Sequence, residues 1–169
     1  MSIAQEKITI VFPMAGEGSR FGYKFKPFLT FNDKLFIENA VSSFLEYSDI
    51  IEEIVFIFTK DQEEKFNVSR ILKKKLGDKF KITPAILENK TSSQYETVYQ
   101  GIKLKNIKSR KIIICDCDHM LNVDNIFKKA SENKYDCIVP VWKIGLNDIK
   151  SWSIMSISED KEPIAISEK

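Results

Sequence analysis

Glycines and cations are concentrated in one segment near the start of the sequence, directly after a run of β-branched residues. The segment from Val11 to Phe28 reads VFPMAGEGSRFGYKFKPF and holds three of the six glycines, together with Arg20 and Lys26. Backbone N–H groups in such a loop can approach an anion closely, because glycine has no Cβ and accepts positive φ. An arginine can hydrogen-bond two phosphate oxygens, and a lysine adds a point charge. These residue types favour a polyphosphate ligand; the alternative is a plain strand–helix connection with a surface arginine and lysine.

The spacing of the glycines excludes two familiar phosphate-binding motifs. The dinucleotide pattern G-x-G-x-x-G is met at Gly16 and Gly18 but fails at Phe21, and Gly22 comes one residue late. A P-loop counted from Gly16 also places Phe21 where glycine is required. The second expected strand ends without the acidic residue that a dinucleotide ribose needs.

A second candidate site is the acidic end of an apolar run, KIIICDCD, at residues 111–118. On a continuous strand, Asp116 and Asp118 would share one face. Carboxylates with water and substrate phosphates are the ligands that Mg²⁺ prefers. The pair therefore predicts a magnesium site at this end of the strand.

Two alternatives are open for this segment. The other strand face would carry Cys115, Cys117 and His119, which could hold zinc. That site is weak because a structural zinc needs a fourth ligand, the chain has no CxxC and no second histidine, and Cys137 could join only through packing. The other alternative is a pair of buried thiols beside surface acids.

Strand-like and helix-like segments alternate along the chain, which predicts an α/β fold with a mostly parallel sheet covered on both faces. Ligands in such sheets bind beyond the carboxyl ends of the strands, where both candidate sites fall. Asp61 with Glu64 and Ser93 with Glu96 have capping-box spacing, and Gly77 suits the end of a helix. The expected strands are Ile8–Phe12, Glu52–Thr59, Lys81–Leu87, 111–118 and Asp136–Trp142; the expected helices cover 36–45, 61–76, 93–102 and 123–130, and a hairpin covers 152–169.

Composition places the chain among ordinary globular proteins. Its 169 residues are 43% hydrophobic and 30% charged, with a formal net charge of +2. That charge gives no case for a nucleic-acid or membrane partner, and the first apolar run is too short to cross a membrane. Three cysteines are few and odd in number, which indicates reduced thiols in a cytoplasmic protein. We expect a single domain over 1–169.

The motifs resemble, in order, those of the sugar-phosphate nucleotidyltransferases. FPMAGEGSRFGYKFKPF is similar to the family pattern (M/A)-A-G-x-G-x-R followed by K-P-(L/F), and NDKLFIENAV is similar to G-K-P-(M/L)-I-E-x-x-V. YETVYQGI, CDCDHML and the final AISEK resemble the helix start, the metal aspartate and the E-K segment of the family. The resemblance covers about Ile8 to Lys169. It implies a Rossmann-like three-layer α/β/α fold of the GT-A-like type, with a mostly parallel mixed sheet.

The resemblance also implies an activity: Mg²⁺-dependent transfer of NMP from a nucleoside triphosphate to a sugar phosphate or similar phosphorylated metabolite, with release of pyrophosphate. Both reactants are anions, so catalysis would consist mainly of charge neutralisation and alignment. No general base is needed, because a phosphate monoester is already an anion near neutral pH. The resemblance implies that Arg20 binds the leaving phosphates, Lys26 the reacting phosphates and Lys169 the acceptor phosphate. It implies Asp118 and Asp116 as metal ligands. The residues implied to hold the nucleotide are Met14, Ala15, Gly16, Glu17, Gly18 and Ser19, with Gln94 as a contact to the base.

The chain departs from the family in two places. Ser92-Ser93-Gln94 stands where relatives often have a glycine whose backbone faces the base. Relatives also continue well beyond the E-K segment, and that part supplies much of the sugar pocket and a second metal-binding aspartate, so we expect the C-terminal acceptor-binding part to be missing. Two alternatives stay open: a glycosyltransferase that uses a nucleotide sugar, for which Asp116-Cys117-Asp118 spells a D-x-D pattern, and a nucleotide-binding domain without catalysis. The base, the acceptor and the oligomeric state are not predicted.

Overall fold

The chain divides into two compact units, Met1–Val123 and Asp124–Lys169. A computed structural model describes residues 7–18, 22, 24–132, 134–145, 152–160 and 162–167. The single domain over 1–169 stays a prediction.

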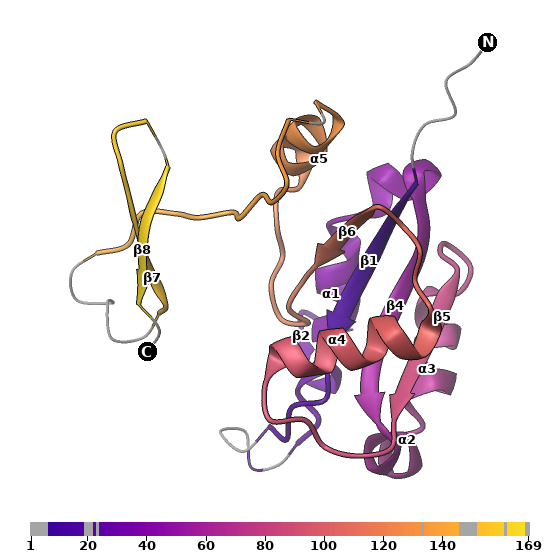
Figure 1. Cartoon of the computed structure of the whole chain (residues 1–169). Coiled ribbons are helices and arrows are strands. Elements are labelled where there is room, and N and C mark those ends of the chain that lie inside the picture. The colour runs from indigo at the N-terminus through magenta and orange to yellow at the C-terminus, as the bar shows by residue number, and fades with distance from the viewer. Residues whose placement is uncertain are drawn as a thin grey trace. The chain divides into compact units, whose positions relative to one another are not determined.

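A parallel four-stranded sheet forms the centre of the first unit, with strand order β5-β4-β1-β6 (Figure 1). Every pairing within it is parallel, as the alternation of strands and helices predicts. Long runs of β-branched and aromatic residues suit these strands because both faces of the sheet are covered. The strands are β1 (Ile8–Pro13), β4 (Ile51–Thr59), β5 (Ile82–Leu87) and β6 (Lys111–Ile114).

Helices cover both faces of this sheet, which gives three layers. Alternate strand residues point to opposite faces of the sheet. Those on the face covered by α4 (Gln94–Lys105) form an apolar cluster that includes Val11 and Ile57. The residues on the opposite face include Phe12. Its ring stacks on Phe56 with 5.4 Å between the ring centroids and contacts Phe44 edge-on with 6.3 Å between the centroids. Figure 1 shows α4 in front of the sheet and α1 (Phe36–Ser42) behind it. The α/β fold class predicted from the sequence is confirmed.

Helix α4 approaches the sheet closely because Gly101 has no side chain. A Cβ at this position would lie 2.6 Å from Cγ1 and 2.9 Å from Cγ2 of the fully buried Ile57. We expect Gly101→Ala to lower the free energy of unfolding by about 1 kcal/mol, because overpacking costs more than the gain in helix propensity. In the Ile57→Ala background the same change should instead be stabilising, since the Ile57 side-chain atoms that the new Cβ meets are gone. Urea unfolding of the four proteins measures both values; an equal cost in both backgrounds would contradict close packing at this contact.

The segment after β4 forms two helices where the sequence predicted one. Helix α2 (Lys60–Phe66) ends at Asn67, which has a left-handed φ of 49°, and α3 (Val68–Leu76) follows. Asparagine tolerates this conformation, so the chain turns there without a glycine. The predicted cap at Asp61 and Glu64 is wrong: Thr59 is the N-cap of α2, with Gln62 as its capping-box partner. Gly77 ends α3 with a right-handed φ of −64°.

Short elements connect these parts of the first unit. The predicted helix over 36–45 ends at Ser42 as α1, and a 3₁₀ segment follows. The predicted cap of α4 is confirmed, because the Ser93 side chain accepts a hydrogen bond from the backbone N–H of Glu96 at 3.2 Å. The remaining elements are the 3₁₀ turns η2 (Lys26–Phe28) and η3 (Leu45–Ile50) and the two-stranded pair β2 (Thr30–Phe31) and β3 (Lys34–Leu35).

Within its described residues, the second unit contains one helix and one hairpin. Helix α5 spans Asp124–Ser131, and β7 (Ile154–Ile157) pairs antiparallel with β8 (Pro163–Ser167), as the tail pattern predicts. The predicted strand Asp136–Trp142 is wrong, since none of these residues is in a strand. Val139, Val141 and Trp142 are each more than half exposed, so they do not form the buried strand that their composition indicates. No helix within the described ranges is long and apolar enough to span a membrane.

Candidate functional site

The glycine-rich segment leaves the sheet at the carboxyl end of β1. The backbone N–H of Met14 donates to the Ile57 carbonyl oxygen at 2.7 Å, which extends the pairing of β1 with β4 by one residue. Gly16 and Glu17 are then exposed, and Gly18 has a φ of 65°. A Cβ on Gly18 would also collide with the carbonyl oxygen of Lys24, so only glycine fits there. The segment is thus fixed to the sheet at the buried Met14, and its backbone is exposed at Gly16 and Glu17.

A buried glutamine from α2 holds this exposed backbone in place. The Gln62 side-chain Nε2 donates to the Gly16 carbonyl oxygen at 3.1 Å. Its Oε1 accepts from the backbone N–H of Thr59 at 2.8 Å, as part of the capping box. Because each end of the amide has a partner of the matching kind, Gln62 connects the glycine segment to the start of α2.

Replacing Gln62 by glutamate separates these two contacts. A carboxylate still accepts from the Thr59 N–H, since glutamate suits this capping-box position, but it cannot donate to the Gly16 carbonyl oxygen. We expect backbone amides of residues 14–17 to exchange hydrogen about tenfold faster, from the loss of one net hydrogen bond, while α2 keeps its protection. Mass-spectrometric exchange measures both regions. Gln100→Glu in α4 makes the same change elsewhere, and equal exchange of residues 14–17 in both variants would contradict the anchoring role.

Two hollows open at this edge of the sheet. One, of about 250 Å³, lies beside the glycine segment, and Lys90 forms an ion pair with Glu17 on its wall. The hydrogen bond from Lys90 holds the pKa of the Glu17 carboxyl below its ordinary value. The other, of about 290 Å³, has Asp118 in its wall. The first hollow is lined by Ala15, Gly16, Glu17, Phe25, Thr59, Asp61, Gln62, Lys65, Phe66 and Lys90; the second is lined by Phe31, Phe36, Asn39, Asp118 and Met120.

An ion pair joins the segment after β1 to the segment after β6. The Lys26 Nζ lies 2.5 Å from Asp118 Oδ2, and the two side chains are only 33% and 22% exposed. Lys26 opens the turn η2, in which the next residue, Pro27, is buried. The chain after Asp118 is held by the Leu121 N–H, which donates to Ser43 Oγ at 3.0 Å. Two segments far apart in the sequence therefore meet beyond the carboxyl ends of the neighbouring strands β1 and β6.

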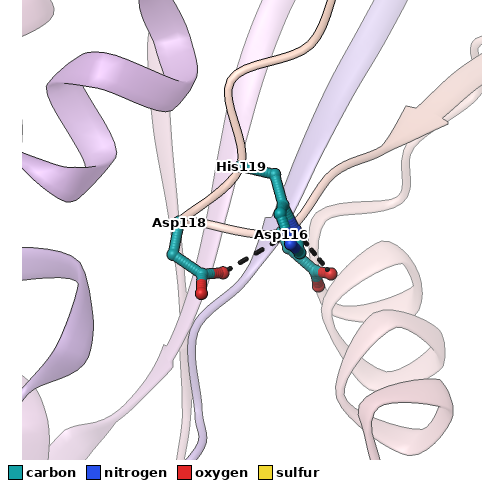
Figure 2. Close-up of side chains that lie close together, drawn as sticks. All are labelled: Asp116, Asp118 and His119. Atoms are coloured by element: carbon teal, nitrogen blue, oxygen red, sulfur yellow. Dashed lines mark ion pairs between the residues drawn. The ribbon is translucent and has the colours of Figure 1, made fainter. Parts of the chain in front are cut away.

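Three potential metal ligands meet in the same place: Asp116, Asp118 and His119 (Figure 2). The His119 Nδ1 lies 3.2 Å from Asp116 Oδ2 and 3.8 Å from Asp118 Oδ1. The Gln94 Nε2, at the start of α4, donates to Asp116 Oδ1 at 2.7 Å. One ligand atom from each of the three residues lies within 4.8 Å of the others, so the donor set fits one divalent cation.

The predicted division of this segment between two strand faces is wrong. Strand β6 ends at Ile114, and the next residue adds a last ladder bond from the Cys115 N–H to the Val11 carbonyl oxygen at 3.0 Å. Pro13, the next residue of β1 on this side, has no N–H to continue the ladder. The chain then turns, which brings His119 to the two aspartates instead of to the cysteines.

The zinc alternative with Cys115, Cys117 and His119 is wrong as well. Among the described residues, the cysteines join no group of ligands close enough to share an ion. Cys115 and Cys117 are buried, while Cys137 is exposed. Burial, followed by the nearby aspartate charges, raises the pKa of the Cys115 thiol to about 12, and burial does the same for Cys117. The two thiols belong to the core beneath the site.

The structure brings together part of the residue set predicted from the sequence. Lys26, Asp116, Asp118 and Gln94 are linked by the contacts above, and Met14 to Gly18 follow β1. Ser19, Arg20 and Lys169 lie outside the described residues. Sequence reasoning missed Gln62 and Lys90 and did not place His119 with the aspartates. A Thr-x-x-Gln pattern at Thr59 was the available signal for Gln62; no pattern indicated Lys90.

No protein-family model and no curated protein matches the sequence. Solved structures do match. The nucleoside-diphosphate-sugar pyrophosphorylase from Vibrio cholerae is 26% identical to this chain, with a TM-score of 0.53. The match covers 64% of this chain and 47% of that protein. A UDP-glucose pyrophosphorylase complexed with UDP-glucose is 18% identical and covers 92% of this chain and 65% of its own, with a TM-score of 0.69.

A third similar structure is HddC from Yersinia pseudotuberculosis complexed with GMP-PN. It is 19% identical and covers 96% of this chain and 69% of its own, with a TM-score of 0.69. The chain spans 47% and 65% of the lengths of the first two structures. These likenesses show that the chain has the Rossmann-like fold of nucleotide-sugar pyrophosphorylases and related nucleotidyltransferases.

Proposed function

We propose that the chain is a nucleotidyltransferase that transfers NMP from a nucleoside triphosphate to a sugar phosphate or similar phosphorylated metabolite and releases pyrophosphate. One observation carries the proposal: the Lys26–Asp118 ion pair joins the glycine segment after β1 to the acidic turn after β6. A glycine-rich segment, a cation and a carboxylate cluster thus lie at the carboxyl ends of neighbouring strands. The matching structures, which include one with UDP-glucose and one with GMP-PN, support the class of ligand.

In the proposed reaction, an acceptor phosphate oxygen attacks the α-phosphorus in line, and the bond to the pyrophosphate breaks. The chain's task is to bring two anions together and to stabilise the charge that develops. Exposed backbone from Gly16 to Gly18 would face the triphosphate, and Lys26 would place an ammonium on the reacting phosphates. Arg20, outside the described residues, would take the leaving phosphates, and Lys169 the acceptor phosphate.

A divalent cation is part of the proposal, and the residues present fit it. Asp118 and Asp116 would hold the ion, which supplies positive charge against the phosphate oxygens. Lys26 is paired with Asp118 in the free protein, so each partly compensates the charge of the other at an edge that is only partly exposed. Gln94 fixes one oxygen of Asp116 and thereby the direction of the other.

Pyrophosphate release from a panel of nucleoside triphosphates and sugar phosphates, with a divalent cation present, tests the proposal. We expect release with at least one pair of substrates and its loss in Lys26→Ala and Asp118→Ala. Activity that survives both changes would contradict the mechanism. Hydrolysis of nucleotide sugars without pyrophosphate formation would favour the glycosyltransferase alternative, and triphosphate binding in calorimetry without turnover of any acceptor would favour a binding domain.

A further inference from the structure

We propose that His119 is the third protein ligand of the divalent cation, and that the site therefore binds Mn²⁺ in clear preference to Mg²⁺. This inference rests on the proposed function for its site but concerns metal binding alone. The motif resemblance supplies an aspartate and no histidine at this place. Figure 2 shows His119 directed at both aspartates from the same turn.

The hydrogen bonds around the cluster divide the carboxylate oxygens into two kinds. Gln94 donates to Asp116 Oδ1 at 2.7 Å, and Lys26 pairs with Asp118 Oδ2 at 2.5 Å. The other oxygen of each aspartate faces the His119 Nδ1. The neutral Gln94 amide orients the Asp116 carboxylate for an ion, whereas the Lys26 ammonium directs Asp118 Oδ1 toward His119 but also adds a charge that repels a cation. The two inner oxygens and the imidazole nitrogen therefore form a set of three donors that converge on one place.

This set of two carboxylate oxygens and one imidazole nitrogen is not the set of ligands that Mg²⁺ favours. Mg²⁺ takes oxygen ligands and keeps several waters, so an imidazole nitrogen adds little to its binding. First-row transition metals accept imidazole together with carboxylates, and Mn²⁺ is the member closest to Mg²⁺ in its use of oxygen ligands. His119 is 39% exposed and Asp116 46% exposed, so an ion from solvent can reach the cluster without unfolding of the core.

His119 is the only histidine of the chain, which makes a direct test possible. Mn²⁺ added to the tag-free 169-residue protein without nucleotide is measured by electron paramagnetic resonance. We expect the electron-spin-echo modulation of a directly bound imidazole nitrogen, which can come only from His119. In His119→Ala this modulation should vanish, Mn²⁺ should bind about tenfold more weakly, and Mg²⁺ affinity, measured by competition, should change by less than about threefold.

Two further variants serve as controls for this measurement. Glu88→Gln removes an exposed carboxylate outside the cluster and should leave the nitrogen signal and the Mn²⁺ affinity unchanged. His119→Gln keeps a polar side chain but should lack the nitrogen signal, and circular dichroism checks that both histidine variants fold. The inference is overturned if Mn²⁺ does not bind, if bound Mn²⁺ shows no nitrogen, or if the Mn²⁺/Mg²⁺ ratio is unchanged in His119→Ala. A nitrogen signal in a protein that releases no pyrophosphate would instead reject the proposed function and keep the ligand.

Discussion

Replacing Asp118 by asparagine is expected to lower kcat/KM for pyrophosphate release about a thousandfold, the scale at which a preorganised electrostatic group contributes to a transition state. Asp118 faces two partners at once: its Oδ2 pairs with Lys26, and its Oδ1 faces His119. Asparagine keeps the size of the side chain but removes the negative charge on which both a metal ion and the Lys26 ammonium depend. Initial rates with a coupled pyrophosphate assay measure the effect.

The matched control for this change is Asp78→Asn. Asp78 is exposed and lies between α3 and the beginning of β5, at the opposite edge of the sheet from the site. The Asp78→Asn change also removes one carboxylate, and it should leave kcat/KM within about twofold of the unchanged protein, as for most surface substitutions. Because Asp118 is partly exposed, its replacement should also leave the fold intact. An Asp118→Asn protein with more than a tenth of the normal activity would remove this residue from the proposed mechanism.

The elements of the central sheet were predictable because their burial dictates their composition. Strands covered on both faces must be apolar in nearly every position, so Ile8–Pro13 and Ile51–Thr59 stand out from any helix pattern. The same reasoning failed for Asp136–Trp142, where a similar composition lies exposed and unpaired among the described residues. Composition records what a strand can bury; it does not record whether a neighbouring strand is there to pair with it.

The site was predictable only in outline. Parallel strands bring their carboxyl ends to one edge, which is why Lys26 and Asp118 could be expected near each other. The direction of His119 could not be predicted, because alternation along a strand holds only while the ladder continues. The ladder between β1 and β6 stops where Pro13 cannot donate, and the turn after it places the imidazole beside the aspartates. Gln62 was missed because Asp61, two residues after Thr59, offered an equally good capping pattern.

The ion pair of Lys26 with Asp118 leads to a prediction with two opposite signs. We expect Lys26→Met to lower kcat for pyrophosphate release about a hundredfold, because an ammonium aimed at the reacting phosphates is lost. The same change should raise the affinity of the free protein for a divalent cation about fivefold. The Lys26 charge repels an incoming cation and occupies Asp118 Oδ2, and a unit charge about 4 Å away contributes about 1 kcal/mol even at the dielectric constant of water.

These opposite signs separate a role in charge stabilisation from a role in folding. If Lys26 only supported the turn η2, its loss would weaken metal binding and turnover together, because the aspartate turn would lose a contact. If it acts on the phosphates and competes with the metal, turnover falls while metal affinity rises. Methionine keeps most of the aliphatic stem, so packing beside the buried Pro27 is little changed. Lys34→Met, at the exposed residue of strand β3, is the matched control and should change neither quantity. Calorimetric titration with the metal alone, set beside kcat at saturating substrate, decides between the two roles, and a fall in both values would contradict the catalytic one.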